Sequence, residues 1–235
     1  MEITAETLEE FKEGQLVLID KPLEWTSFDV VNKMRYLLKK KFEVKKIKVG
    51  HGGTLDPLAT GLMMIGIGKA TKQLEELQGQ DKTYIAKIKL GETTPSFDSE
   101  TEVDQTFSTE HITKEIVEDA LNSFIGEQDQ VPPLFSAKHV NGQRAYHLAR
   151  KGSDMELPPS KVTIYKAELL EYNFPELSVE VVCSKGTYIR SFARDLGRKV
   201  NSGGYLSGLR RTQSGSFSIE DAMSIEEFEK KLIDL

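Results

Sequence analysis

The order of strand-like and helix-like segments constrains the fold of this chain more than any other feature. Apolar and polar residues alternate at about residues 83–90, 162–170 and 177–184, as they do in half-buried strands. Helical spacing appears after Ser27 and again at about residues 189–200. These segments interleave irregularly, and neighbouring strands are often joined by tight turns. The pattern predicts an α+β fold with a mixed, mostly antiparallel central sheet flanked by helices.

The length of the chain and its cysteine content set the broad class. With 235 residues, we expect one domain over residues 1–235, with a small insertion at about 92–160. A lone cysteine, Cys183, excludes an internal disulfide framework, and four histidines without metal-ligand spacing give no basis for a zinc site. The acidic N-terminus is no signal peptide, and no apolar run approaches about 18 residues. A cytoplasmic protein without a membrane segment is expected.

Charge is distributed unevenly along the chain. The formal net charge is −6, which argues against a protein that coats nucleic acid without selectivity, because Lys and Arg must neutralise phosphates. Residues 33–48 nevertheless carry eight basic side chains against one acidic, and residues 185–211 carry seven against one. Each run alone is typical of a solvated helix face. Arg190, Arg194 and Arg198 are expected to share one such face.

One segment resembles a nucleotide-binding loop but lacks its spacing. A P-loop needs Gly five residues before its Gly-Lys pair and Ser or Thr directly after the Lys. Around Gly68-Lys69 those positions are Met63 and Ala70, and the dinucleotide-binding pattern fails at Thr71. Neither kind of nucleotide site is expected.

A Gly-dense segment at residues 48–57 carries the most informative candidate chemistry, and we expect it to form an irregular loop. Its glycines and proline bracket one carboxylate, Asp56, and one imidazole, His51. Such a loop lets backbone approach a large planar ligand while it aims a single acid at that ligand. A structural Asp-Pro turn that caps the next segment is the alternative reading.

Residues 50–61 (GHGGTLDPLATG) resemble the nucleophile motif of the TruB family of tRNA pseudouridine-55 synthases. The family's other motifs follow in the expected order, and together they span residues 18 to about 219. They are Asp20-Lys21-Pro22 with Trp25-Thr26-Ser27, Lys82-Thr83-Tyr84, residues 130–137 (QVPPLFSA), Gly186-Thr187-Tyr188-Ile189-Arg190 and Gly208-Leu209-Arg210-Arg211. The resemblance implies the pseudouridine synthase fold, with a central RNA-binding cleft, and isomerisation of one uridine in the T arm of tRNA.

Roles are implied residue by residue. Asp56 matches the nucleophile, Tyr84 the ring that stacks on the flipped uracil and a candidate for handling its C5 proton, and Arg190 the partner of Asp56. Tyr188 and Leu209 match walls of the base pocket.

Three further residues match binding positions of the family. His51 would fill the gap left in the RNA, and Lys21 and Pro22 would shape the pocket floor. These types suit the task, because flipping a uridine out costs a few kcal/mol that stacking and an inserted side chain can offset. Burial would favour a neutral Asp56, and Arg190 would oppose this.

The reaction that the resemblance implies needs neither a cofactor nor a metal, because the base is detached, rotated and rejoined without a redox or hydrolytic step. The partner would be the T-arm stem-loop of tRNA, and a monomer is the default. About 16 residues follow Ile219, so we expect no C-terminal PUA domain. The catalytic domain alone would then bind the T arm, with both basic runs supplying most of the phosphate contacts.

Local expectations follow from the same segments. Ser27 is predicted to cap a helix that buries Phe28, Val31, Met34 and Leu38 on one face. Glu24 stands where many family members have Gly, so this turn is expected to form without a positive φ angle.

Two other functions compete with the isomerase. A non-catalytic RNA-binding or RNA-chaperone protein could use the same fold, although it would not need a carboxylate facing RNA. A hydrolase of the N-glycosidic bond could use Asp56, but it would also need a positioned water and usually a second acid or base. No paired carboxylate at useful spacing is evident in the sequence.

Overall fold

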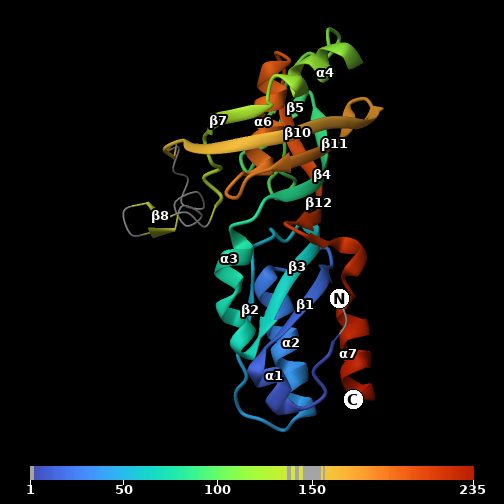
Figure 1. Cartoon of the computed structure of the whole chain (residues 1–235). Helices are drawn as coiled ribbons and strands as arrows, with labels where there is room; N and C mark the ends of the chain where they lie inside the picture. Colours follow the sequence, from blue (N-terminus) through green and yellow to red (C-terminus); the bar gives the residue numbers. More distant parts are fainter. Residues whose placement is uncertain (1–2, 137–138, 141–142, 145–154, 156) are drawn as a thin grey trace. The chain divides into compact units, whose positions relative to one another are not determined.

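The computed structural model describes residues 3–136, 139–140, 143–144, 155 and 157–235. The chain divides into two compact units (Figure 1). Unit 1 consists of Met1–Tyr84 with Arg210–Leu235, and unit 2 of Ile85–Leu209. Strands β4 (Lys82–Leu90) and β12 (Gly204–Ser214) run from one unit into the other. Organisation as one domain over residues 1–235, with an insertion at 92–160 and no PUA domain, stays a prediction.

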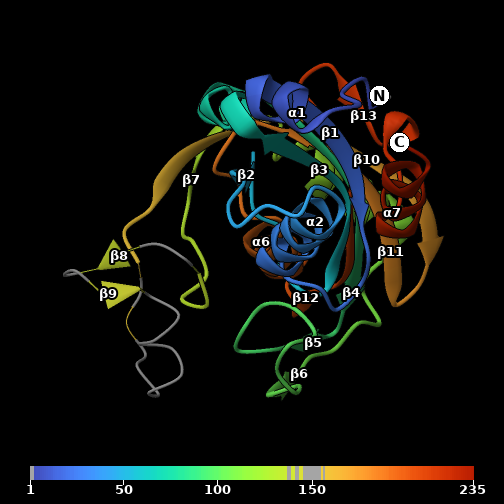
Figure 2. The same cartoon turned by 90° about the horizontal axis from the view of Figure 1, so that it is seen from below.

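Unit 1 packs helices against a small antiparallel sheet. Strand β1 pairs with β3 from Gln15 opposite Ile67 to Lys21 opposite Gly61, and β2 also pairs with β3. Helix α2 lies on the concave side of these strands (Figure 2), and α7 packs against α2. The elements are α1 (Leu8–Gly14), β1 (Gln15–Lys21), α2 (Ser27–Lys41), β2 (Val49–His51), β3 (Ala59–Ile67), η1 (Gly68–Lys72), α3 (Leu74–Gln78), β13 (Phe217–Ser218), η2 (Ile219–Asp221) and α7 (Ile225–Asp234).

Unit 2 is built on long antiparallel strands. Strand β10 pairs with β11 on one side and with β7 on the other. Helices α4 and α6 contact each other, and the Phe124 and Phe192 rings pack with centroids 4.9 Å apart. The elements are β5 (Glu92–Thr93), β6 (Gln105–Thr106), α4 (Lys114–Asn122), β7 (Gly126–Gln130), β8 (His139–Val140), β9 (Gln143–Arg144), β10 (Ser160–Asn173), β11 (Glu176–Cys183) and α6 (Ile189–Lys199).

These elements confirm the α+β class with a mostly antiparallel sheet. The segment at 48–57 was expected to be an irregular loop. The structure differs in part, because residues 49–51 form β2 and pair with β3. The Asn141-Gly142 pair, whose sequence favours a hairpin turn, lies outside the described residues. Within the described ranges, no helix is both long enough and apolar enough to span a bilayer.

The start of α2 differs from the prediction by one residue. Thr26 is the N-cap, and a capping box joins it reciprocally to Asp29. This frees the Ser27 side chain for another contact, described below. Phe28 does not face the core as predicted and is 63% exposed, whereas Val30, Val31, Met34 and Leu38 are buried.

Glu24 adopts the conformation that its side chain was expected to prevent, with φ at 66°. Its backbone N–H donates to the Pro57 carbonyl at 2.9 Å. This left-handed conformation costs a residue with a Cβ about 1–2 kcal/mol relative to Gly. The turn therefore keeps its shape at a local energetic cost.

We expect Glu24→Gly to raise the free energy of unfolding by about 1 kcal/mol, since Gly removes the Cβ penalty and retains the backbone bond to Pro57. Glu24→Ala, the matched control, keeps a Cβ and should show no comparable gain. Urea denaturation of the three proteins measures the difference. Equal stability of the Gly and Ala variants would contradict the strain at this position.

Candidate active site

The loop that carries Asp56 is anchored at both ends to β3. After β2, the backbone N–H of Gly52 donates to the Met64 carbonyl at 2.8 Å, and the Ala59 N–H donates to the Asp56 carbonyl at 3.0 Å. A Cβ at Gly52 would lie 3.3 Å from a Met64 methyl, so a larger residue there would require the Met64 side chain to shift. Asp56 is partly exposed, between buried Leu55 and exposed Pro57. The loop thus presents its carboxylate at a held position.

Ser27 holds the residue before Asp56. Its buried hydroxyl donates to the Leu55 carbonyl at 3.0 Å and accepts from the Leu55 N–H at 2.8 Å. One side chain therefore satisfies both main-chain polar groups of Leu55, a buried residue whose polar groups need partners. The first turn of α2 and the Asp56 loop form one hydrogen-bonded piece.

Lys21 joins the same loop to the turn that precedes α2. Its side chain is fully buried, and its ammonium donates to three carbonyls, those of Pro22 at 2.9 Å, Trp25 at 2.5 Å and Pro57 at 3.3 Å. An ammonium has three N–H donors, so each one can find a partner here. Lys21 therefore connects the turn before α2 to the Asp56 loop, whose Pro57 lies 36 residues further along the chain.

The electrostatic environment of Lys21 includes Asp56. The pKa of Lys21 is lowered from its ordinary 10.5 to about 8, chiefly by burial, while the negative charges of Asp56 and Asp29 raise it and the positive charge of Arg211 lowers it. Lys21 thus remains mostly protonated at neutral pH, near the predicted nucleophile. This interaction agrees with the predicted place of Lys21 in the pocket but does not test it.

His51 ends strand β2 and is half-buried. Burial lowers the pKa of its imidazole, the charge of Arg211 contributes in the same direction, and the nearby Gly53 backbone opposes them. A pKa below 6.5 leaves the ring neutral at pH 7. A neutral ring costs less to insert among bases than an imidazolium would, because less charge is desolvated.

In unit 2, Arg190 has a partner that the sequence did not reveal. Its guanidinium lies 3.4 Å from the carboxylate of Asp98, and both side chains are almost fully buried. Asp98 also accepts from the Ser96 hydroxyl at 2.6 Å and from the Glu100 N–H at 2.9 Å. Asp98 falls in the insertion expected at about residues 92–160, and no sequence signal separates it from the acidic residues around it.

The middle and arginine motifs meet within unit 2. The Gln130 side-chain amide accepts from the Tyr188 N–H at 2.8 Å and donates to the Tyr188 carbonyl at 3.1 Å. The Ser191 hydroxyl donates to the Val131 carbonyl at 2.8 Å. These bonds fix the backbone at Tyr188 and the start of α6.

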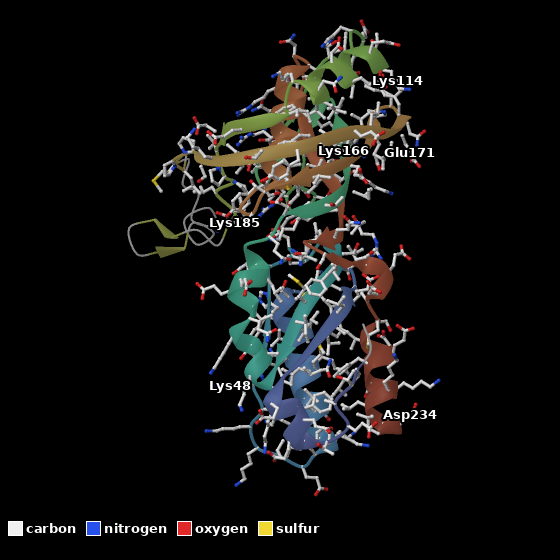
Figure 3. The ribbon with its side chains drawn as sticks, in the orientation of Figure 1. Lys48, Lys114, Lys166, Glu171, Lys185 and Asp234 are labelled. Atoms are coloured by element: carbon white, nitrogen blue, oxygen red, sulfur yellow. The ribbon has the colours of Figure 1, made fainter. Side chains whose placement is uncertain are left out.

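The two basic runs differ in exposure. The sequence favoured a solvated helix face for each run, and the structure corrects this for the second one. Arg190 and Arg194 are buried and so do not form the exposed stripe expected with Arg198, and Arg211 of the same run is buried too. Arg194 is ion-paired with Asp195 at 2.8 Å and lies over the Phe97 ring. The first run remains at the surface, where Lys48 points away from the sheet (Figure 3). Its exposed members are Lys39, Lys40, Lys41, Lys45, Lys46 and Lys48.

The predicted site residues are divided between the units. Unit 1 brings together Lys21, Pro22, His51 and Asp56 in one loop system and also contains Tyr84, which is buried on β4. Unit 2 contains Tyr188, Arg190 and Leu209. Pairing of Arg190 with Asp56 and the base-pocket roles stay predictions. Within the described part of the chain, no three His, Cys, Asp or Glu side chains are grouped to hold a metal.

The lowered pKa of Lys21 predicts a specific dependence of stability on pH. Between about pH 8 and 10.5 the unfolded chain binds more protons at this residue than the folded protein does, so unfolding should become less favourable as the pH rises. The free energy of unfolding of wild type minus that of Lys21→Met should therefore increase from pH 7.5 to 10. Urea denaturation at both pH values measures it, and a flat or falling difference would contradict the shifted titration.

Comparisons with known proteins identify the family of this chain. Residues 39–189 match the family described as TruB family pseudouridylate synthase (N terminal domain), and residues 190–234 match the tRNA pseudouridylate synthase B C-terminal domain. The protein named tRNA pseudouridine synthase B from Phocaeicola vulgatus is 60% identical over 218 residues, with 93% of each chain covered. Its namesake from Parabacteroides distasonis is 54% identical, with 94% of each chain covered.

Among solved structures, the chain resembles one in the crystal structure of a Cbf5-Nop10-Gar1 complex, with a TM-score of 0.70 and 27% identity. The match covers 94% of this chain but spans only about half of that one, 54%. It supports the expected pseudouridine synthase fold. The family matches and the identity over nearly the whole length show that this chain belongs to the TruB family of pseudouridylate synthases.

Proposed function

We propose that this enzyme converts uridine 55 in the T loop of tRNA into pseudouridine, with Asp56 as its nucleophile. One observation carries the proposal: Asp56 lies on a loop that Ser27 and Lys21 tie to two other segments. The loop has the sequence of the family's nucleophile motif, and relatives of the chain are named tRNA pseudouridine synthase B.

The chemistry requires positioning more than acid–base strength. The Asp56 carboxylate attacks either C1′ of the ribose or C6 of the uracil. The bond between C1′ and N1 breaks, the base rotates, and a bond forms between C1′ and C5. C5 loses its proton, and N1 gains one, so no electrons are exchanged with an external group and no cofactor is needed. Tyr84 stacks on the base and is a candidate for handling the C5 proton.

Arg190 can serve two carboxylates at once. A guanidinium has five N–H donors in a planar fork, so its bond to Asp98 leaves donors for Asp56. Asp98 would then orient the fork, and Arg190 would keep Asp56 charged. Tyr188 and Leu209 would form walls of the base pocket, and Pro22 would form part of its floor with Lys21.

Six exposed lysines of the first basic run supply the phosphate contacts in this proposal. His51 enters the space that the flipped nucleotide leaves. The enzyme would act as a monomer in the cytoplasm. A non-catalytic RNA-binding protein is the second candidate, and the experiment that follows separates the two.

Replacing Asp56 with Asn should abolish isomerisation and preserve RNA binding, since Asn keeps the shape of the side chain but not its nucleophilic charge. The assay uses a T-arm stem-loop with tritium at uridine C5, and it follows tritium release, pseudouridine formation and RNA affinity together. Release by wild type alone supports the proposal. Binding without release by either protein would leave an RNA-binding module, and free uracil would indicate a glycosidase.

Asp98→Asn should slow the reaction by about 10-fold or more, because a neutral amide no longer holds the Arg190 fork in place. RNA affinity and the thermal unfolding midpoint should change much less than the single-turnover rate. Asp104→Asn is the matched control, since Asp104 lies in the same segment but is exposed and bonds to Thr93. Equal rates for the two variants would remove Asp98 from the mechanism.

A further inference from the structure

Arg211 is the largest fully buried side chain of the described residues, with 2% of its surface exposed. Its Nε donates to the Leu62 carbonyl at 2.7 Å, and Nη2 donates to the Gly53 carbonyl at 3.3 Å. The first bond reaches strand β3, and the second reaches the loop that carries Asp56. A single planar group thus connects that loop to the sheet of unit 1.

The backbone around Arg211 is shaped to admit this contact. A Cβ at Gly61 would lie 2.3 Å from the Arg211 carbonyl oxygen, and Gly61 has φ at +107°. Strand β3 can approach β12 this closely only because residue 61 is a glycine. The close approach brings the Arg211 guanidinium within hydrogen-bonding distance of the Gly53 carbonyl. At Gly53 itself, a Cβ would lie 3.5 Å from Nη1.

The charge of Arg211 is not balanced by a direct ion pair. Among the residues that the structure describes, no carboxylate forms a salt bridge with its guanidinium, and its hydrogen bonds go to carbonyl oxygens. Neighbouring Arg210, by contrast, bonds to the Asp20 carboxylate at 2.7 Å. A buried cation is costly unless it is paired or hydrogen-bonded, and here two main-chain carbonyls supply the hydrogen bonds.

Two titratable groups of the Asp56 loop system feel the charge of Arg211. It acts on Lys21 and on His51, and Lys21 in turn interacts with Asp56. Lys21 bonds to the Pro57 carbonyl, one residue after Asp56, and Arg211 bonds to Gly53, three residues before it. Two buried cations therefore flank the carboxylate along the chain.

We propose that Arg211 is a positioning residue for Asp56, which holds the Asp56 loop through the Gly53 carbonyl and places a fixed positive charge beside that loop. This role goes beyond the nucleophile and its Arg190 partner, and it rests on the proposed function of Asp56. If Arg211 only filled space, the reaction rate would not depend on whether the side chain at position 211 is charged. Charge and hydrogen-bond geometry can be separated by substitution.

The test compares Arg211→Lys, which keeps the charge but loses the planar fork, with Arg211→Met, which keeps much of the volume but loses the charge. Single-turnover rates on the T-arm stem-loop are measured from pH 5 to 9. For Arg211→Met we expect a rate about 100-fold lower at neutral pH and an acid limb of the profile about one pH unit higher. Arg211→Lys should lose rate and keep the wild-type acid limb.

A second readout needs no turnover. The ¹³C signal of the Asp56 carboxyl, followed through a pH titration, should show a higher midpoint in Arg211→Met than in wild type or Arg211→Lys. An acid limb and a carboxyl midpoint that coincide in all three proteins would overturn the inference. If Asp56→Asn retains activity, the proposed function fails instead, and the two failures are thereby distinguished.

Two controls accompany the comparison of the Arg211 variants. Lys12→Met removes one positive charge from exposed helix α1 of the same unit and should leave both the profile and the carboxyl titration unchanged. Circular dichroism and thermal unfolding report whether Arg211→Met folds. If it does not, Arg211→Gln replaces it as a neutral variant that can still donate to a carbonyl, with the same expected and contrary results.

Discussion

Two buried cations that bond to main-chain carbonyls hold the loop on which this enzyme's proposed chemistry depends. The ammonium of Lys21 joins the turn before α2 to Pro57, and the guanidinium of Arg211 joins strand β3 to Gly53. Carbonyl oxygens satisfy the donors but do not neutralise the charge. The field of both cations therefore remains available to an anion on the loop, and Asp56 is the carboxylate that lies between the two attachment points along the chain.

This arrangement explains several local features that would otherwise be costly. Glu24 holds a left-handed conformation because its N–H meets the Pro57 carbonyl that Lys21 also binds. Gly61 is required because β12 passes too close for a side chain. Strain and close packing of this kind persist only where the surrounding structure over-determines them. In unit 2 the same principle appears in a different form, because Asp98 holds the buried fork of Arg190 directly.

Much of the fold could be predicted from spacing, and most errors arose where tertiary contacts reassigned a residue. The strand and helix patterns located β4, β10, β11 and α6 closely. Ser27, predicted as a cap, instead bonds to Leu55, and Phe28 is exposed although it has helical spacing with buried neighbours. Arg190 and Arg194 were expected on a solvated face, but Arg190 pairs with buried Asp98, and Arg194 pairs with partly exposed Asp195 and lies over the Phe97 ring. Hydrophobic periodicity depends only on the spacing of residues along one helix or strand. It does not indicate which residue of another element will contact them.

The sequence by itself determined the α+β class, the family, and the set of residues from which a site can be built, because these depend on local patterns and on motifs of fixed order. The tertiary structure alone decided which groups hold these residues in place. Asp98 could not be separated from other acidic residues, and Arg211 from other basic ones, until the chain folded. The physical reason is that burial and hydrogen bonding act between residues far apart in sequence, such as Arg211 and Gly53, whose contact is created only by the pairing of strands.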